Sequence, residues 1–214
     1  MPGVCIASTA RMRSERGVSA MELLVIVALI GVISGVSMPL AQNLLAHLRL
    51  GGDARAASNA LTLAKMRAAA SFTQARLYVD LSAKTFRIET WQKTGTPGWV
   101  TDGGSTSLNA NTALGFGGVS TPPPNSQKTV SQPGLCRNAA GGAVSNTACI
   151  VFNSRGVPIA AKTTGPPDGT ETPLATNALY MTDNSTLYSS TVSAAGAVRL
   201  WRTKTSGGLN WTIQ

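Results

Sequence analysis

The chain has 214 residues, 43% of them hydrophobic, and this length has room for one ordinary domain plus extra elements. Only 13% of the residues are charged, well below the roughly 25% typical of soluble domains. The formal net charge of +9 is compatible with nucleic acid, with an anionic membrane surface or with solubility alone, so charge by itself excludes none of these partners.

A short basic segment opens the chain and ends at Gly17. The 21 residues that follow, 18–38, contain a single charge, Glu22. About 20 consecutive apolar residues are enough to span a bilayer as a helix. We therefore predict a transmembrane helix over 18–39, with its basic N-terminal flank in the cytoplasm.

The lone carboxylate of Glu22 helps to decide which kind of apolar segment this is. A charge in that setting costs about 2.5–3.5 kcal/mol and usually marks a function. A secretory signal peptide has a shorter apolar region with a small-residue cleavage site after it, and an ordinary signal anchor does not explain the acid. A local role remains an alternative, because an acid in the first helical turn interacts favourably with the helix dipole.

The segment 17–24, GVSAMELL, resembles the class III signal of type IV prepilins and type II secretion pseudopilins. The resemblance implies that a prepilin peptidase cuts between Gly17 and Val18 and methylates the new N-terminus. The distances from this bond to Glu22 and Pro39 match the family pattern, although the family usually has Phe where this chain has Val18. In assembly, Glu22 is expected to pair with the N-terminal amine of a neighbouring subunit and so to set their register.

Beyond the apolar segment, apolar residues continue at spacings of three and four, which predicts an amphipathic continuation of the helix over 40–72. Its alanine-rich stripe suits packing on a sheet. Pro39 and the pair Gly51-Gly52 predict local kinks or melting. The single histidine, His47, is assigned a structural or interface role.

After residue 72 the hydrophobic pattern changes to a period of two, which is typical of strands. Segments 76–81 and 84–91 are predicted to form a hairpin. Further strands are predicted at 149–152, 177–182, 186–192, 197–203 and 209–213. The expected fold class is therefore α+β, a long pilin-like N-terminal transmembrane helix packed on an antiparallel β-sheet domain at 73–214.

A low-complexity stretch at 94–148, rich in Pro and Gly-Gly pairs, is predicted to be a long loop. It is either a surface that contacts a partner or a tolerated insertion. If the leader at 1–17 is removed with Cys5, an even pair of cysteines remains, and an even pair in an exported domain predicts a disulfide between Cys136 and Cys149.

The segment 150–157, IVFNSRGV, resembles the strand and turn pattern of the GspH/FimT branch of the same family. Gly156 suits a turn position that needs a positive φ. A generic hairpin turn would look the same. The resemblance covers both ends of the chain and is poor across 94–148.

The sequence contains no catalytic constellation. A single histidine gives no Ser-His-Asp arrangement, and two cysteines without further Cys or His do not make a zinc site. We expect no catalytic residues, no metal and no cofactor, and hence a protein that is not an enzyme.

The C-terminal strands combine the basic residues Arg199, Arg202 and Lys204 with two tryptophans, a combination that can bind nucleic acid. The stretch 196–199, GAVR, only partly resembles the Gly-Arg-x-Arg motif of DNA-binding FimT-like pilins, because Ala197 replaces the first arginine. Arg199 and Arg202 would also point to opposite faces of a strand. A DNA-binding minor pilin for natural transformation therefore stays an alternative, beside a solvated strand edge protected by charge.

Taken together, the resemblance implies a GspH/FimT-like minor subunit of a type IV pilus or a type II secretion pseudopilus. It places the chain in the bacterial inner membrane as a single-pass protein, with its C-terminal domain in the periplasm and in a periplasmic or cell-surface filament after assembly. The implied partners are other pilin or pseudopilin subunits, prepilin peptidase, an inner-membrane assembly platform and membrane lipid. A signal-anchored periplasmic enzyme or binding module remains the alternative from another class.

Overall fold

The computed structural model describes residues 17–206 and 210–214, without the side chains at 36, 39, 40, 42 and 43. The predicted leader therefore lies outside the described residues, except for Gly17. The chain divides into two compact units, Met1–Asn43 and Leu44–Gln214.

Helix α1 (Ala20–Ala70) contains 51 residues and crosses the boundary between the two units. It is uninterrupted at Pro39 and at Gly51-Gly52, so the melting predicted at these positions does not occur. The helix ends where Phe72 adopts a φ of 48° and the Thr73 N–H donates back to the Ala68 carbonyl at 3.2 Å. A left-handed residue of this kind is a common helix terminator.

A membrane span needs a helix of about 20 predominantly apolar residues. Within the ranges 17–206 and 210–214, the structure has no helix of the length and apolarity needed to cross a membrane. This finding overturns the transmembrane helix predicted over 18–39. The predicted α+β class is therefore wrong in its membrane-spanning part, and so is the predicted single-pass location in the inner membrane.

The first sheet has the strand order β3-β2-β1-β4-β5, and every neighbouring pair is antiparallel. Its strands are β1 (Ala75–Asp80), β2 (Thr85–Gln92), β3 (Gly98–Ser107), β4 (Thr147–Phe152) and β5 (Pro158–Ile159). The hairpin predicted at 76–81 and 84–91 is confirmed by β1 and β2. β3, by contrast, lies inside the stretch predicted to be a loop at 94–148, and that prediction is wrong over β3 and over the first two residues of β4.

The second sheet has the order β6-β7-β8-β9 and is also antiparallel. Its strands are β6 (Thr176–Thr182), β7 (Thr186–Ser193), β8 (Val198–Lys204) and β9 (Thr212–Ile213). The first three agree with the predicted segments within one or two residues. β9 is shorter than the strand predicted at 209–213, whose first residue lies outside the described part of the chain.

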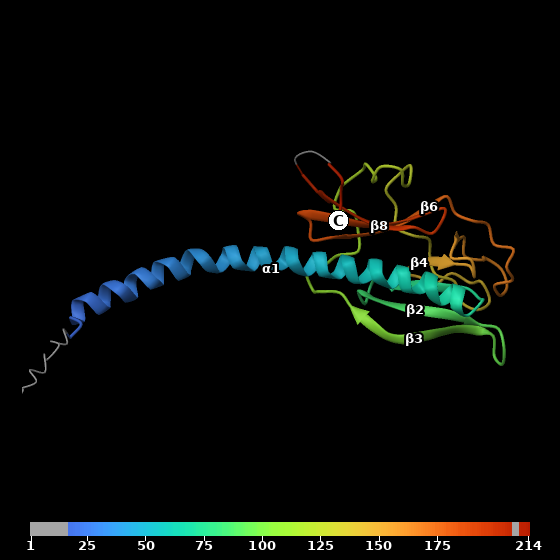
Figure 1. Cartoon of the computed structure of the whole chain (residues 1–214), viewed down its shortest axis with the longest axis horizontal. Coiled ribbons are helices and arrows are strands. Elements are labelled where there is room, and N and C mark those ends of the chain that lie inside the picture. The colour runs from blue at the N-terminus through green and yellow to red at the C-terminus, as the bar shows by residue number, and fades with distance from the viewer. Residues whose placement is uncertain (1–16, 207–209) are drawn as a thin grey trace, which may run out of the picture. The chain divides into compact units, whose positions relative to one another are not determined.

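Both sheets pack on residues 44–70 of α1. The face of the helix toward them is made of small and medium apolar residues that are almost completely buried: Leu50, Ala54, Ala57, Leu61, Ala64 and Ala68. They share one core cluster with Leu77 and Ile150 of the first sheet and with Leu179 and Met181 of the second. In Figure 1, β2 and β3 lie on one side of this part of the helix and β6 and β8 on the other.

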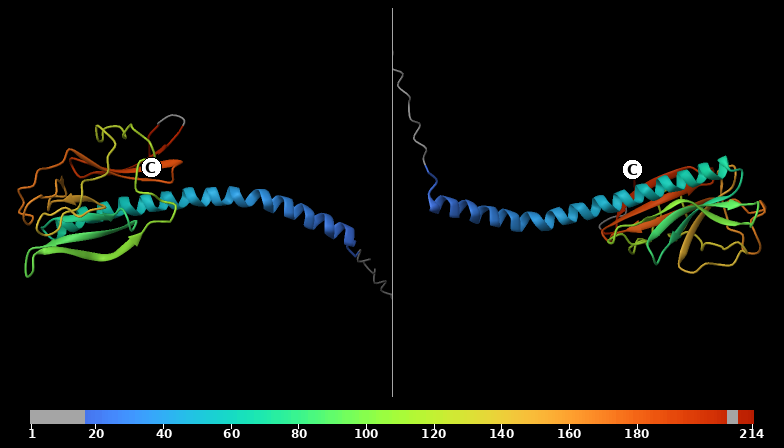
Figure 2. Two further views of the ribbon diagram at one scale, coloured as in Figure 1. Left: turned by 180° about the vertical axis from the view of Figure 1, so that it is seen from behind. Right: turned by 90° about the horizontal axis from the view of Figure 1, so that it is seen from below.

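The segment between β3 and β4 covers the outer faces of both sheets. Val119 belongs to a second buried cluster with Tyr180 and Leu187 of the second sheet. Cys136 belongs to a third, with Val151 and Ile159 of the first sheet. The left view of Figure 2 shows this segment, in yellow-green, beside the strands of the second sheet. The low-complexity stretch is therefore part of the core, because it buries apolar side chains that the helix does not reach.

Candidate functional site

The candidate site begins just before α1, at a helix start that the local sequence explains. The Ser19 hydroxyl accepts a hydrogen bond from the Met21 N–H at 3.3 Å, and the Ser19 carbonyl accepts one from the Leu23 N–H at 3.1 Å. Serine is among the preferred residues at this capping position, because its side chain satisfies an N–H group that has no partner within the helix. The cap fixes the first residue of α1 at Ala20.

The Gly17–Val18 peptide bond lies immediately before this cap, in non-helical backbone. Val18 is 65% exposed, and no atom lies within 4 Å of the place a Cβ atom of Gly17 would occupy. An exposed bond outside regular structure is the kind that a peptidase can reach. The two residues predicted to form the processing site are thus adjacent and accessible.

Glu22 lies in the first turn of α1, three residues after Ser19, and its side chain is exposed. A serine followed by glutamate at this spacing is the capping-box pattern, which supports the alternative that the acid acts on the helix start. None of the ion pairs among the described residues includes Glu22. The side chain of Pro39, the other residue predicted to act in assembly, lies outside the described part of the chain.

The segment 18–38, which includes the start of α1, presents apolar side chains all round within the first unit. Twelve large apolar residues between 18 and 38 are each 48–72% exposed: Val18, Met21, Leu23, Leu24, Val25, Ile26, Val27, Leu29, Ile30, Val32, Ile33 and Met38. Contiguous exposed apolar surface of this kind marks an interaction site.

A disulfide joins Cys136 to Cys149, as the sequence predicts, with the two Cα atoms 4.9 Å apart. Cys149 lies in β4, and Cys136 lies in the segment that covers the outer face of the first sheet. The bridge thus holds this segment on the sheet at its C-terminal end. Both cysteines are buried.

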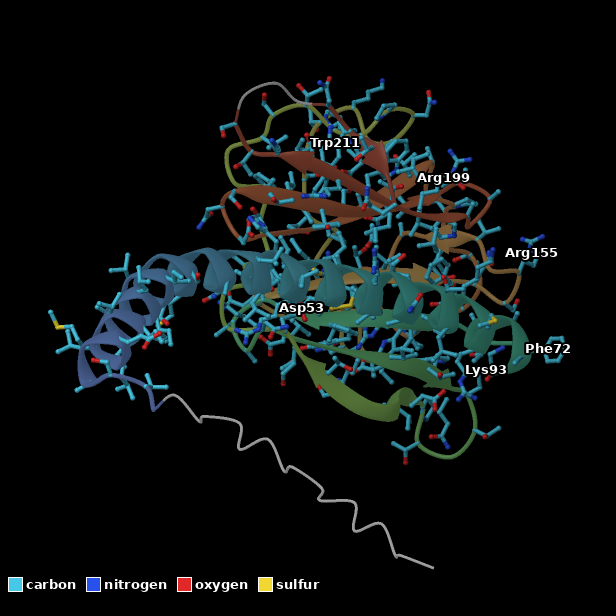
Figure 3. The ribbon with its side chains drawn as sticks, turned by 60° about the vertical axis from the view of Figure 1, so that its left-hand side comes forward. Asp53, Phe72, Lys93, Arg155, Arg199 and Trp211 are labelled. Carbon is cyan, nitrogen blue, oxygen red and sulfur yellow. A yellow bond between two sulfur atoms is a disulfide. The ribbon has the colours of Figure 1, made fainter. Side chains whose placement is uncertain are left out.

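The three C-terminal basic residues do not form one site. Arg199 lies opposite Thr191 and Arg202 lies opposite Tyr188, and an odd separation of three residues puts their side chains on opposite faces of β8. Lys204 shares the face of Arg202. Figure 3 shows Arg199 at the surface of the second sheet, apart from Trp211.

The two tryptophans near these basic residues take part in packing. The Trp201 indole N–H donates to the Thr191 hydroxyl at 3.0 Å, and the ring is only 8% exposed. The Trp211 indole N–H donates to the Thr121 carbonyl at 3.0 Å, and its ring packs on the second core cluster. The buried ring of Trp201 therefore has little surface for stacking with bases, whereas Trp211 is partly exposed, and DNA binding remains a prediction.

A groove between α1 and the first sheet was not predicted from the sequence. It has a volume of about 390 Å³ and is lined by apolar residues of α1 and β2, such as Leu63 and Phe86, and also by the ion-paired side chains of Arg67 and Asp102. Gly103 and Gly104 of β3 also line it. The sequence did not predict this groove, because β3 lies beside it and the residues of β3 were predicted to be part of a loop.

Within the described ranges, no cluster of three or more His, Cys, Asp or Glu side chains is placed to hold a metal ion. In comparisons with known proteins, no family model, no curated protein and no solved structure matches this chain.

Proposed function

We propose that this chain is an assembly subunit of a type IV pilus-like filament, in the manner of GspH/FimT-like minor pilins or type II secretion pseudopilins. A prepilin peptidase cuts it between Gly17 and Val18. The mature subunit then joins other pilin or pseudopilin subunits through its apolar helix. Its role is structural assembly and not catalysis.

The observation that carries the proposal is the position of the candidate cleavage bond. It is exposed, and it is followed within two residues by a capped helix whose apolar side chains have no cover in their own unit. Cutting there would place a free amine at the start of this helix, four residues from the Glu22 carboxylate. The N-terminal amine of one subunit would then supply the countercharge for the Glu22 carboxylate of a neighbouring subunit.

Mass spectrometry of the N-terminus tests the processing step. We expect full-length chain, produced in bacteria with a prepilin peptidase, to begin at Val18 and to carry a methyl group. Without the peptidase it should retain its first 17 residues. Gly17→Val should block the cut, whereas Gly3→Val in the same leader should not. A chain that keeps its leader beside an active peptidase would contradict the proposal.

The two interpretations of Glu22 are separated by comparing two variants. Glu22→Gln removes the charge, so we expect normal cleavage but loss of incorporation into filaments. Ser19→Ala removes the helix cap at a cost of about 1 kcal/mol and leaves the charge in place. If Ser19→Ala impairs incorporation as strongly as Glu22→Gln, the acid acts only on the helix start, and the pairing between subunits is rejected.

A further inference from the structure

A pocket in the second unit lies where the C-terminal end of α1 meets the end of β2 and the turn after β4. Its volume is about 370 Å³, within the roughly 300–1,000 Å³ that is typical of small-molecule sites. Aromatic, amide and charged side chains from segments far apart in the sequence line it together: Phe72, Gln74, Trp91, Lys93, Asn153 and Asp168.

The side-chain amide of Gln74 is a buried polar group of this pocket that the fold does not use. Gln74 is only 8% exposed. Its neighbours are hydrogen-bonded, because the Thr73 hydroxyl donates to the Trp91 carbonyl at 3.0 Å and the Trp91 N–H donates to the Gln74 carbonyl at 2.8 Å. No other group in the described ranges bonds the Gln74 side-chain amide. Since an unpartnered buried amide costs stability, it is available to a ligand that enters the pocket.

Phe72 places an aromatic ring in solvent at the rim of the pocket. Its side chain is 80% exposed, and its φ of 48° is strained for a bulky residue. Lys93 Nζ donates to the Phe72 carbonyl at 3.0 Å and holds the residue in place. Figure 3 shows the Phe72 ring beyond the end of α1, with Lys93 beside it. Glycine usually occupies this position of a helix end, and strained residues cluster at functional sites.

The charged groups of the pocket already have partners. The Asp168 carboxylate pairs with Lys162, and it accepts hydrogen bonds from the Thr170 N–H at 3.1 Å and the Thr170 hydroxyl at 2.7 Å. The Lys93 ammonium group is bound to the Phe72 carbonyl. One charge of each sign thus lines the pocket, and this balance favours a neutral ligand over an anion or a cation.

We propose that this pocket binds a neutral saccharide. A sugar ring has an apolar face of C–H groups and a rim of hydroxyl groups that donate and accept hydrogen bonds. The Phe72 ring offers a flat apolar surface for that face, and the Gln74 amide offers both donors and an acceptor for the hydroxyls.

Asn153 adds donors on the opposite side of the pocket. Its carbonyl oxygen accepts the Arg155 and Val157 N–H groups, each at 3.0 Å, and this orientation leaves its NH₂ group directed away from the turn. Sugar binding goes beyond the proposed function and does not depend on it.

Saturation-transfer NMR with the full-length chain, kept in a detergent that contains no sugar, tests the binding. The probes are glucose, galactose, maltose, cellobiose and diacetylchitobiose at millimolar concentration, and trialanine represents an extended peptide. We expect at least one sugar to bind and trialanine not to bind. If none of the sugars binds, or if trialanine binds and the sugars do not, the inference is overturned.

The role of Gln74 is tested by Gln74→Met, which keeps the length of the side chain and removes the amide. Because this amide has no partner in the described part of the fold, the variant should keep or raise the urea midpoint and should weaken sugar binding about tenfold. The matched control is Gln92→Met, at the exposed end of β2 and outside the pocket. It should bind as the native chain does. Equal binding in the two variants, or a lower urea midpoint in Gln74→Met, would reject the site.

Phe72→Gly tests the ring and its strained backbone together. Glycine adopts a positive φ without strain, so we expect the urea midpoint to stay or rise while sugar binding weakens. Phe72→Tyr keeps an aromatic surface at the rim and should retain binding. If Phe72→Gly binds the sugar as tightly as the native chain, the ring is not part of a saccharide site and the inference fails.

Discussion

Gly156 and Gly196 lie so close together that a Cβ atom added to Gly196 would overlap the Gly156 carbonyl oxygen. They occupy matching turns in different sheets. Each glycine N–H donates at 2.8 Å to the residue three positions earlier, Asn153 in one turn and Ser193 in the other. Their φ values are 74° and 73°. Lys65 of α1 joins them, since its ammonium group donates to the Gly196 carbonyl at 3.0 Å.

Three glycines have nearly the same positive φ but different surroundings. Replacing each of them by alanine therefore separates the cost of backbone strain from the cost of steric overlap. Gly165 has a φ of 74° with open space around it, so Gly165→Ala should cost only the left-handed strain of about 1–2 kcal/mol. In Gly156→Ala the new methyl group would lie 2.8 Å from Lys65 Cε, which is flexible and can move. In Gly196→Ala it would strike backbone, which cannot move alone.

We therefore expect the free energy of unfolding to fall most in Gly196→Ala, less in Gly156→Ala and least in Gly165→Ala. Urea unfolding followed by tryptophan fluorescence measures this, because all four tryptophans lie in the second unit. A loss in Gly165→Ala equal to that in Gly196→Ala would show that the two turns are not in contact.

The buried carboxylate of Glu89 should be far more important for stability than the partly exposed carboxylate of Asp102 in the same sheet. It accepts hydrogen bonds from the Arg76 and Arg87 guanidinium groups at 2.7 and 2.8 Å. The Arg76 side chain is only 4% exposed, and its guanidinium carbon lies 4.0 Å from the centre of the Trp99 ring. Burial lowers the pKa of Arg76, and the Glu89 charge opposes that shift.

Glu89→Ala would leave the Arg76 charge buried without its partner, so we expect a loss of about 3–5 kcal/mol. The matched control is Asp102→Ala, which breaks the pair between Arg67 and Asp102 at 2.8 Å on the surface. Exposed pairs contribute about 0–1 kcal/mol. Chemical denaturation measures the free energy of unfolding of both variants. Equal losses of stability would show that burial does not make the Glu89 pair more important than the Asp102 pair.

The disulfide between Cys136 and Cys149 should stabilise the second unit by about 3 kcal/mol, because in the unfolded chain it closes a loop between two residues that are 13 positions apart. The double variant Cys136→Ala, Cys149→Ala should therefore have a lower urea midpoint than the native chain. Reductant should lower the native midpoint and leave that of the double variant unchanged. If reductant has no effect on the native chain, the bridge does not contribute to its stability.

Stability at acidic pH should depend on Asp183. Burial of this carboxyl group disfavours its ionised form, but hydrogen bonds from the Thr186 and Ser185 N–H groups and from the Ser185 hydroxyl outweigh burial and lower the pKa of Asp183. His47 Nδ1 also lies 3.1 Å from its carboxylate.

A carboxylate with a lowered folded-state pKa contributes stability that is complete above the unfolded value of about 3.9 and is lost as pH falls through the folded value. Asp183→Asn should therefore reduce stability at pH 6 and flatten its fall below pH 4. Thermal unfolding across this range measures the effect. If Asp183→Asn loses stability below pH 4 as steeply as the native chain, Asp183 does not contribute to the acid sensitivity of the fold.

Local signals in the amino-acid sequence were enough to predict much of the second unit. Alternation of apolar and polar residues located β1, β2, β6, β7 and β8 because each has a face turned to the core, and the glycine of FNSRG predicted the positive φ of Gly156. If the predicted leader with Cys5 is left aside, the even count of cysteines was enough to predict the pairing of Cys136 with Cys149. In the first unit, the processing role of Gly17 and Val18 and the assembly role of Glu22 stay predictions.

Tertiary structure alone decided the rest, because those features depend on contacts between distant residues. β3 has mostly exposed residues and no apolar alternation, and only pairing with β2 makes it a strand. The contact of Gly156 with Gly196, the burial of Arg76 beside Glu89 and the groove between α1 and β2 all join segments far apart in the chain. The membrane span was predicted from hydrophobic composition alone. The structure has no helix that could span a membrane within its described residues.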